Sequence, residues 1–209
     1  MQHGKMPMRS ERSLCDGNRH SVTISFDGGD LGRGVLMKNG RLIRLALVDN
    51  DRCSAEMMAL LIGRTIPEAH MLWVTDNPSL ALERCLFDPR KPDILICDLM
   101  MDGLNGVRLT ERIRQRNVQV GVIVVTSYDL ATYGEDIACC GAQALISKRD
   151  FAATIREAVK SVFDGGTYPH GWGLIAYGGC RTAGSGWCQA LLRSRAGGVA
   201  SLCTSCTDR

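Results

Sequence analysis

The feature that most constrains this chain is an alternation of short continuous apolar runs with segments of helical apolar period between residues 41 and 163. Continuous apolar runs are typical of strands buried on both faces. The expected strands are 42–48, 70–75, 93–97, 118–125 and 144–147, and the expected helices are 51–64, 79–87, 105–116, 129–140 and 149–163. Parallel strands need helical crossovers, so the pattern predicts an α/β fold with a doubly wound five-stranded parallel sheet. The β-branched run at 118–125 is the expected sheet centre.

The two flanks differ in composition from this middle part. Seven of the 23 glycines lie in residues 1–40 and nine lie in 166–209. Glycine is a poor former of helices and strands. We therefore expect an irregular or disordered extension over 1–40, one domain over 41–163, and a linker with a disordered Gly/Cys/Ser-rich tail over 164–209.

The composition of the chain excludes collagen-like proteins and highly charged disordered proteins. The chain is 45% apolar and 22% charged, as in globular proteins, and its net charge of +3 points to no particular partner. No apolar run approaches the ~18 residues that span a bilayer, and the N-terminus lacks the apolar stretch of a signal peptide. The expectation is a cytoplasmic protein without membrane association, whose ten cysteines are reduced thiols.

Polar residues follow four of the five expected strands. In a parallel α/β sheet, ligands bind beyond the carboxyl ends of the strands. The residues at those ends are Asp49, Asn50 and Asp51 after the first strand, Asp98 after the third, Thr126 and Ser127 after the fourth, and Lys148 after the fifth. The sequence thus predicts two acidic turns, a hydroxyl and a lysine at one edge of the sheet.

This arrangement resembles the receiver domain of two-component response regulators, over about residues 41–163, and the resemblance implies a flavodoxin-like fold. The motifs that carry it are the acidic turn 49–51, the stretch 92–103 around Asp98, the Thr126-Ser127 pair, and Gly141-Ala142 leading to Ser147-Lys148. The segment 162–168 is similar to the linker that precedes a LuxR/FixJ-type output domain.

The resemblance implies a phosphoprotein in a phosphorelay rather than an enzyme. Asp98 would accept a phosphoryl group from a sensor histidine kinase, and Thr126 and Lys148 would contact the phosphate. Phosphoryl transfer needs a cation to offset the charge of the carboxylate and the incoming oxygens. Mg²⁺ would be held by Asp49, Asn50, Asp51, Asp98 and the backbone carbonyl of Met100.

Three departures from the family pattern bear on this expectation. Asn50 stands where the family has a second acid that contacts the metal; either Asp51 compensates or the affinity for Mg²⁺ is low. Asp102 and Arg149 replace the usual prolines. Leu145 occupies the position of the aromatic switch residue, and we interpret the nearby Tyr128 as an exposed loop aromatic.

Asn50 and Leu145 also support an alternative, a phosphorylation-independent interaction or dimerisation module, and a homodimer is a further expected partner. A hydrolase is less well supported, because position 100 is Met rather than a general-acid carboxylate.

A transcription regulator of this type would bind DNA through a helix-turn-helix domain, but the tail shows no such pattern. DNA is therefore an expected partner only if an output domain exists that this chain does not show. The change in composition after about residue 170 suggests that unrelated or out-of-frame sequence has replaced that domain. A parallel hypothesis for the other flank is that residues 1–36 precede a true start at Met37.

Overall fold

The computed structural model describes residues 42–170 and 172. The strands are β1 (Ile43–Val48), β2 (Ala69–Thr75), β3 (Ile94–Asp98), β4 (Gly121–Thr126) and β5 (Ala144–Ser147). The helices are α1 (Arg52–Thr65), α2 (Pro78–Phe87), α3 (Gly106–Arg114), α4 (Leu130–Cys139) and α5 (Phe151–Phe163), with a short 3-10 turn η1 (Lys148–Asp150). The expected extension 1–40 and the tail from residue 173 onward lie outside the described residues.

The five strands form one parallel sheet in the order β2-β1-β3-β4-β5, which confirms the predicted fold class. The expectation that the run 118–125 forms the sheet centre is wrong, because β3 has that place. The β4 strand nevertheless pairs with β3 on one side and β5 on the other, and all of its residues are buried. This interior position suits its β-branched valines. Residues 118–120 precede the strand in a turn.

Side-chain caps determine where four of the helices begin. Asp51, Asn77, Asn105 and Asp129 are the N-cap residues of α1, α2, α3 and α4, and each side chain accepts a hydrogen bond from a backbone N–H of the first turn. These bonds satisfy donors that a helix leaves without a partner. Each helix therefore starts a few residues beyond the strand before it, and the intervening loop lies at the carboxyl edge of the sheet.

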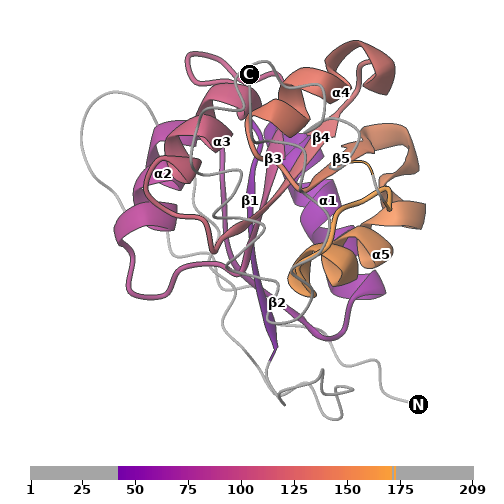
Figure 1. The fold of residues 1–209 in the computed structure, drawn as a ribbon. Coiled ribbons are helices and arrows are strands. Elements are labelled where there is room, and N and C mark those ends of the chain that lie inside the picture. Colours follow the sequence, from indigo (N-terminus) through magenta and orange to yellow (C-terminus); the bar gives the residue numbers. More distant parts are fainter. Residues whose placement is uncertain (1–41, 171, 173–209) are drawn as a thin grey trace, which may run out of the picture.

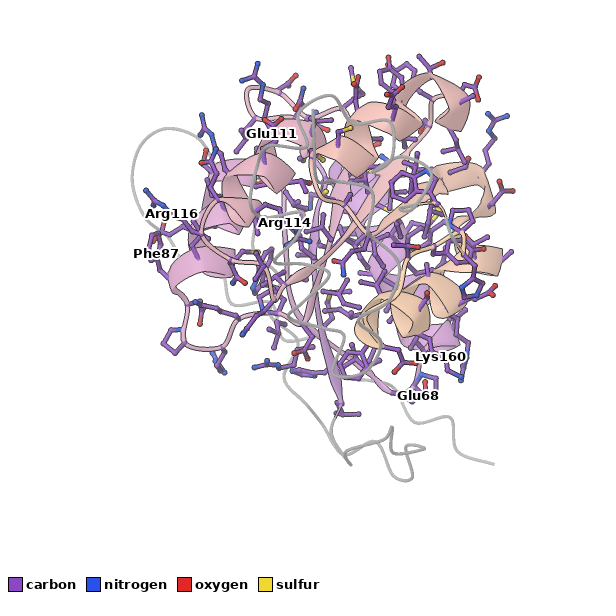
Figure 2. All side chains as sticks on the ribbon, viewed as in Figure 1. Glu68, Phe87, Glu111, Arg114, Arg116 and Lys160 are labelled. Atoms are coloured by element: carbon purple, nitrogen blue, oxygen red, sulfur yellow. The ribbon has the colours of Figure 1, made fainter. Side chains whose placement is uncertain are left out.

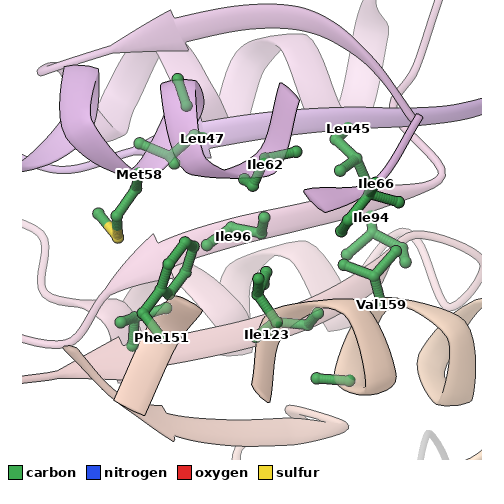
Figure 3. Packing of buried hydrophobic residues seen from close by; sticks show 14 of the residues in the cluster. Leu45, Leu47, Met58, Ile62, Ile66, Ile94, Ile96, Ile123, Phe151 and Val159 are labelled. Atoms are coloured by element: carbon green, nitrogen blue, oxygen red, sulfur yellow. The ribbon is translucent and has the colours of Figure 1, made fainter. Parts of the chain in front are cut away.

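Helices cover the two faces of the sheet in different sets (Figure 1). Along each strand, successive residues point to opposite faces. Leu45, Ile96 and Ile123 contribute to a core with α1 and α5, in which Phe151 and Ile62 are buried (Figure 3). Ala46, Leu95 and Val122 instead face a second core beneath α2, α3 and α4. Both cores hold the strand ends, and hence the loops at that edge, in fixed positions.

A buried arginine at the end of α3, Arg114, connects that helix to the segments that precede β4 and β5 (Figure 2). Arg114 is 2% exposed. Its guanidinium donates to the carbonyl oxygens of Gly141 and Val120, at 2.9 and 2.7 Å, and to the Gln143 side-chain oxygen at 3.0 Å. The same oxygen of Gln143 accepts the backbone N–H of Val122. These bonds fix the entry of the chain into β4 and β5.

The chain continues in contact with the sheet after α5. Tyr168 forms a parallel bridge with Ala144, donates its N–H to the carbonyl of Gln143 and accepts the N–H of Leu145. The N–H of Trp172 donates to the carbonyl of Pro169, and Trp172 packs against the second core. Residues 167–170 and Trp172, here called the edge strap, therefore begin beside the outer edge of β5 and end at α4.

Candidate functional site

Four loops meet at the carboxyl edge of the sheet. Asp49 directly follows β1, Asp98 and Thr126 end β3 and β4, and Lys148 directly follows β5. The strand register pairs Asp98 with Val125, the residue before Thr126, and pairs Thr126 with Ser147, the residue before Lys148. The acidic, hydroxyl and lysine positions that the sequence singled out are thus on neighbouring strands at the same level of the sheet.

The Lys148 ammonium bridges two carboxylates. Its Nζ lies 2.7 Å from Oδ2 of Asp49 and 3.0 Å from Oδ1 of Asp98. Asp49 is fully buried and Asp98 is 6% exposed. Two carboxylates in such a place repel one another and lose hydration, so the ammonium between them offsets part of that cost.

The backbone of the loop after β3 holds the other oxygen of Asp98. The N–H of Met100 donates to Oδ2 of Asp98 at 3.1 Å. The loop then returns to the strand, because the N–H of Gly106 donates to the carbonyl of Leu99 at 2.9 Å. A Cβ on Gly106 would lie only 2.5 Å from the carbonyl oxygen of Asp98. Glycine at the start of α3 is therefore required for the loop to pack this closely.

The environment of the site raises the pKa of both bridged groups, which favours the neutral form of Asp98 and the charged form of Lys148. Burial raises the pKa of Asp98 above its ordinary value; the hydrogen bond from Lys148 lowers it, and the charge of Asp49 raises it again, so the net shift is upward. Burial alone would lower the pKa of Lys148, but its hydrogen bonds to Asp49 and Asp98 outweigh that effect and the pKa is raised. The site therefore holds a charged lysine next to a carboxylate whose charge is only partly compensated.

In the acidic turn, Asp49 and Asp51 accept different backbone hydrogen bonds. Oδ1 of Asp49 accepts the backbone N–H of Asp51 at 2.9 Å, which tightens the turn. Oδ1 of Asp51 accepts the N–H groups of Cys53 and Ser54 as the cap of α1. The side chain of Asn50 is exposed.

Thr126 is connected to the loop that leads into α4. It is fully buried, and its Oγ1 accepts the backbone N–H of Tyr128 at 3.1 Å. The Tyr128 side chain is half exposed, in keeping with the expected loop aromatic, and its ring contacts the Tyr133 ring edge-on with centroids 6.0 Å apart. Leu145, the expected switch position, is 3% exposed and packs in the second core.

The donor set at this edge suits a hard cation such as Mg²⁺. Asp49 and Asp98 supply carboxylate oxygens, and Met100 and Asn50 can add carbonyl and amide oxygens, which are ligands that Mg²⁺ takes together with water. Within residues 42–170 and 172, no cluster of three or more His, Cys, Asp or Glu side chains is gathered as a metal site. Two carboxylates supplemented by neutral oxygens suit a hard cation that keeps several of its waters.

Sequence reasoning missed three parts of this arrangement. The pairing of Lys148 with Asp49 joins residues 99 positions apart, and no local pattern signals it. The backbone N–H of Met100 contacts Asp98, whereas the expectation concerned only the Met100 carbonyl. Gly106 could have been noticed, because glycine directly after the cap residue Asn105 is an unusual choice for a helix start.

Comparisons with known proteins identify the family of the chain. The family model for the response regulator receiver domain matches residues 45–160. The transcriptional regulatory protein DegU of Brevibacillus brevis is 28% identical over 132 residues, which cover 63% of this chain and 55% of that protein. The DNA-binding transcriptional activator EvgA of Escherichia coli is 32% identical over 78 residues, or 37% of this chain and 38% of that protein. The matches thus span about half or less of these relatives.

Solved structures give the same fold. A two-component response regulator of the LuxR family from an Aurantimonas species superposes with a TM-score of 0.56 at 22% identity, covering 60% of this chain and 88% of that one. The response regulator domain of Thermotoga maritima CheB gives a TM-score of 0.53 at 21% identity, covering 59% and 98%. Because the family model matches more than half of the chain, and its range contains all the site residues, the chain belongs to the response regulator receiver domain family.

Proposed function

We propose that Asp98 accepts a phosphoryl group from a phosphohistidine of a sensor kinase and holds it as an acyl phosphate. The observation that carries this proposal is the Lys148 ammonium between the carboxylates of Asp49 and Asp98, at 2.7 and 3.0 Å. A structural ion pair with Lys148 needs only one carboxylate. The second carboxylate, that of Asp98, is slightly exposed at the sheet edge and is therefore the group available for phosphorylation.

The transfer requires no acid or base from the protein beyond the nucleophile. An oxygen of Asp98 attacks phosphorus, the phosphorus–nitrogen bond of the donor breaks, and the histidine nitrogen keeps the electron pair. The Met100 N–H orients the Asp98 carboxylate, and Lys148 offsets the negative charge that the phosphoryl oxygens bring. Thr126, at the adjacent strand end, donates its hydroxyl to a phosphoryl oxygen.

Mg²⁺ would be held by Asp49, Asp98, the carbonyl of Met100 and Asn50, with Asp51 available beyond its capping bond. When bound, it supplies positive charge that stabilises the oxygens of the transferred group. The chain's own part is to position Asp98 and to keep Lys148 between the two carboxylates.

The partners follow from the same proposal. A sensor histidine kinase is the expected donor. Some relatives are named as DNA-binding regulators, but every helix and strand in the described part of this chain belongs to the receiver fold, so DNA binding would need a further domain. The proposed role is that of a signalling acceptor rather than an enzyme. None of the helices within the described part has the length and apolar character needed to cross a bilayer.

The test is phosphorylation of the full chain by acetyl phosphate with Mg²⁺, followed by intact mass. One added phosphoryl group is expected in the wild type and none in Asp98→Ala. Asp102→Ala is the matched control, since Asp102 is an exposed acid in the same loop and its loss should leave phosphorylation intact. An unmodified wild type would favour the phosphorylation-independent module instead.

A further inference from the structure

The outer surface of α3 is basic. Arg108 and Arg112 lie one turn apart on this helix, Arg116 follows just beyond its end, and all three side chains are exposed. Glu111 is the one acid of the helix. None of the three arginines forms an ion pair with another side chain among residues 42–170 and 172, so these cations are not neutralised within that part of the chain.

The outer surface of α4 is acidic. This helix has no basic residue, and the side chains of Asp129, Glu135 and Asp136 are exposed. Asp129 accepts the N–H of Ala131 as the helix cap. Within the described part of the chain, none of the three carboxylates forms an ion pair. The charges of α4 are therefore opposite to those of α3.

The helices α3 and α4 are neighbours and run in the same direction. The strands that lead into them, β3 and β4, are paired and parallel. At the other end of the helices, Nε of Arg114 donates to the carbonyl of Gly141, just after α4, at 2.9 Å. Both helices cover the second core (Figure 1). One face of the molecule therefore carries a basic helix beside an acidic helix.

Such a face is complementary to itself. A two-fold axis between α3 and α4 places α3 of one copy against α4 of the other, so that the same contact forms twice. The axis reverses the direction of the helices, and the opposed helices are antiparallel. Arg108, at the start of α3, then meets Asp136 near the end of α4, and Arg116 meets Asp129. The lengths agree, because at about 1.5 Å per residue the outer charges of each helix span roughly 10 to 12 Å.

Two exposed aromatic side chains lie at the same contact. Phe87, the last residue of α2, is 65% exposed, and Tyr128, which precedes α4, is 50% exposed. The end of α2 lies beside the end of α3, because Nδ2 of Asn117 donates to the carbonyl of Cys85, and Figure 2 shows Phe87 and Arg116 at this end. The two-fold arrangement brings this end toward Tyr128 of the second copy. The apolar area supplements ion pairs that contribute little by themselves on a surface.

We propose that a second copy of this chain binds to the face formed by α3 and α4, in an antiparallel two-fold arrangement in which the arginines of α3 pair with the acids of α4. A polyanion such as a nucleic acid would be attracted by α3 but repelled by the neighbouring α4, which favours a second copy as the partner. The inference goes beyond the proposed function and does not depend on phosphorylation of Asp98.

The test is sedimentation velocity of the full chain over a concentration series, at low and at high salt, without a phosphodonor. A reducing buffer prevents disulfide-linked dimers of a chain with ten cysteines. The wild type should form a dimer and no larger species, and the dimer should weaken at high salt, because opposite charges hold it together. A monomer at every concentration, or a series of larger species, would overturn the proposal.

A charge exchange tests the pairing itself. Arg108→Asp and Asp136→Arg should each raise the dissociation constant of the dimer about tenfold, since each change places like charges in both copies of one contact. The variant with both changes should regain the affinity of the wild type. Arg64→Glu, an exposed change on α1 at the other face of the sheet, is the control and should leave the dimer intact. A dimer that tolerates both single changes, or a double variant that folds without recovering affinity, would refute the pairing; thermal unfolding checks that each variant is folded.

Discussion

The Lys148 ammonium lies closer to the Asp49 carboxylate, at 2.7 Å, than to Asp98, at 3.0 Å. The fully buried Asp49 thus holds the lysine in place, and the second carboxylate that the lysine contacts is that of Asp98. This relationship lets one cation serve both the stability of the sheet edge and the proposed phosphorylation of Asp98, and the first two predictions depend on it.

Replacing Lys148 by Met should impair both stability and phosphorylation. The two carboxylates would face each other uncompensated, at a cost of about 1–3 kcal/mol in the free energy of unfolding after allowance for the partial exposure of the lysine. Phosphorylation by acetyl phosphate should slow by roughly a hundredfold, since a charge that stabilises the transferred group is lost. Urea unfolding and timed intact-mass measurements test this. Arg149→Met, an exposed neighbour, should behave like the wild type; equal effects in both variants would refute a specific role.

Asp98→Asn should stabilise the Mg²⁺-free protein at neutral pH. The folded-state pKa of Asp98 is raised above its unfolded value, first by burial and also by Asp49. A carboxyl with a raised pKa contributes stability while it is protonated, and this contribution is lost as the pH rises through the folded pKa. The variant never ionises, so its advantage should be present at neutral pH and shrink as the pH falls toward about 4, near the unfolded pKa. Urea unfolding in EDTA over a pH series measures the difference; a constant or absent advantage would contradict the raised pKa.

Asn50→Asp should strengthen Mg²⁺ binding. The exposed amide would become a carboxylate beside Asp49, and about 1.4 kcal/mol of added attraction corresponds to a tenfold lower dissociation constant. Calorimetric titration with Mg²⁺ gives the constant directly. Asn77→Asp is the control, because aspartate caps a helix as well as asparagine does and Asn77 is already the cap of α2. Unchanged affinity in Asn50→Asp would place the cation away from this turn.

Gly106→Ala should destabilise the protein by about 1–3 kcal/mol, because its Cβ would meet the Asp98 carbonyl at 2.5 Å and the backbone cannot yield without moving the site. Phosphorylation should slow as well. Gly63→Ala in α1 is the matched change: nothing lies within 4 Å of its added Cβ, and alanine in a helix should stabilise by about 0.5–1 kcal/mol. Thermal unfolding of both variants provides the comparison, and shifts of the same sign would count against the close packing.

Arg114→Met should lower the free energy of unfolding by about 3 kcal/mol, since the buried carbonyls of Gly141 and Val120 and the oxygen of Gln143 would lose their donor. The exposed Arg116 two residues later is the control (Figure 2), and Arg116→Met should stay within about 0.5 kcal/mol of the wild type. Chemical denaturation distinguishes the two; a mild effect of Arg114→Met would mean that water replaces the guanidinium.

Much of this molecule could be predicted from the chain alone. The apolar runs and helical periods are local signals, so the order of strands and helices from β1 to α5 and the placing of Asp49, Asp98, Thr126 and Lys148 at strand ends followed from them. Ends of strands were displaced by one to three residues, as for β4, because pattern alone does not show where pairing begins.

Only the tertiary structure decided how these residues meet. The lysine between two acids, the contact of Gly106 with the Asp98 carbonyl and the run of the strap from β5 to Trp172 all join positions that are neighbours in space through the packing of several elements. The periodicity of the sequence predicts which residues face the core. Which distant residues they contact there depends on strand order and loop path, and these are decided only when both cores are packed.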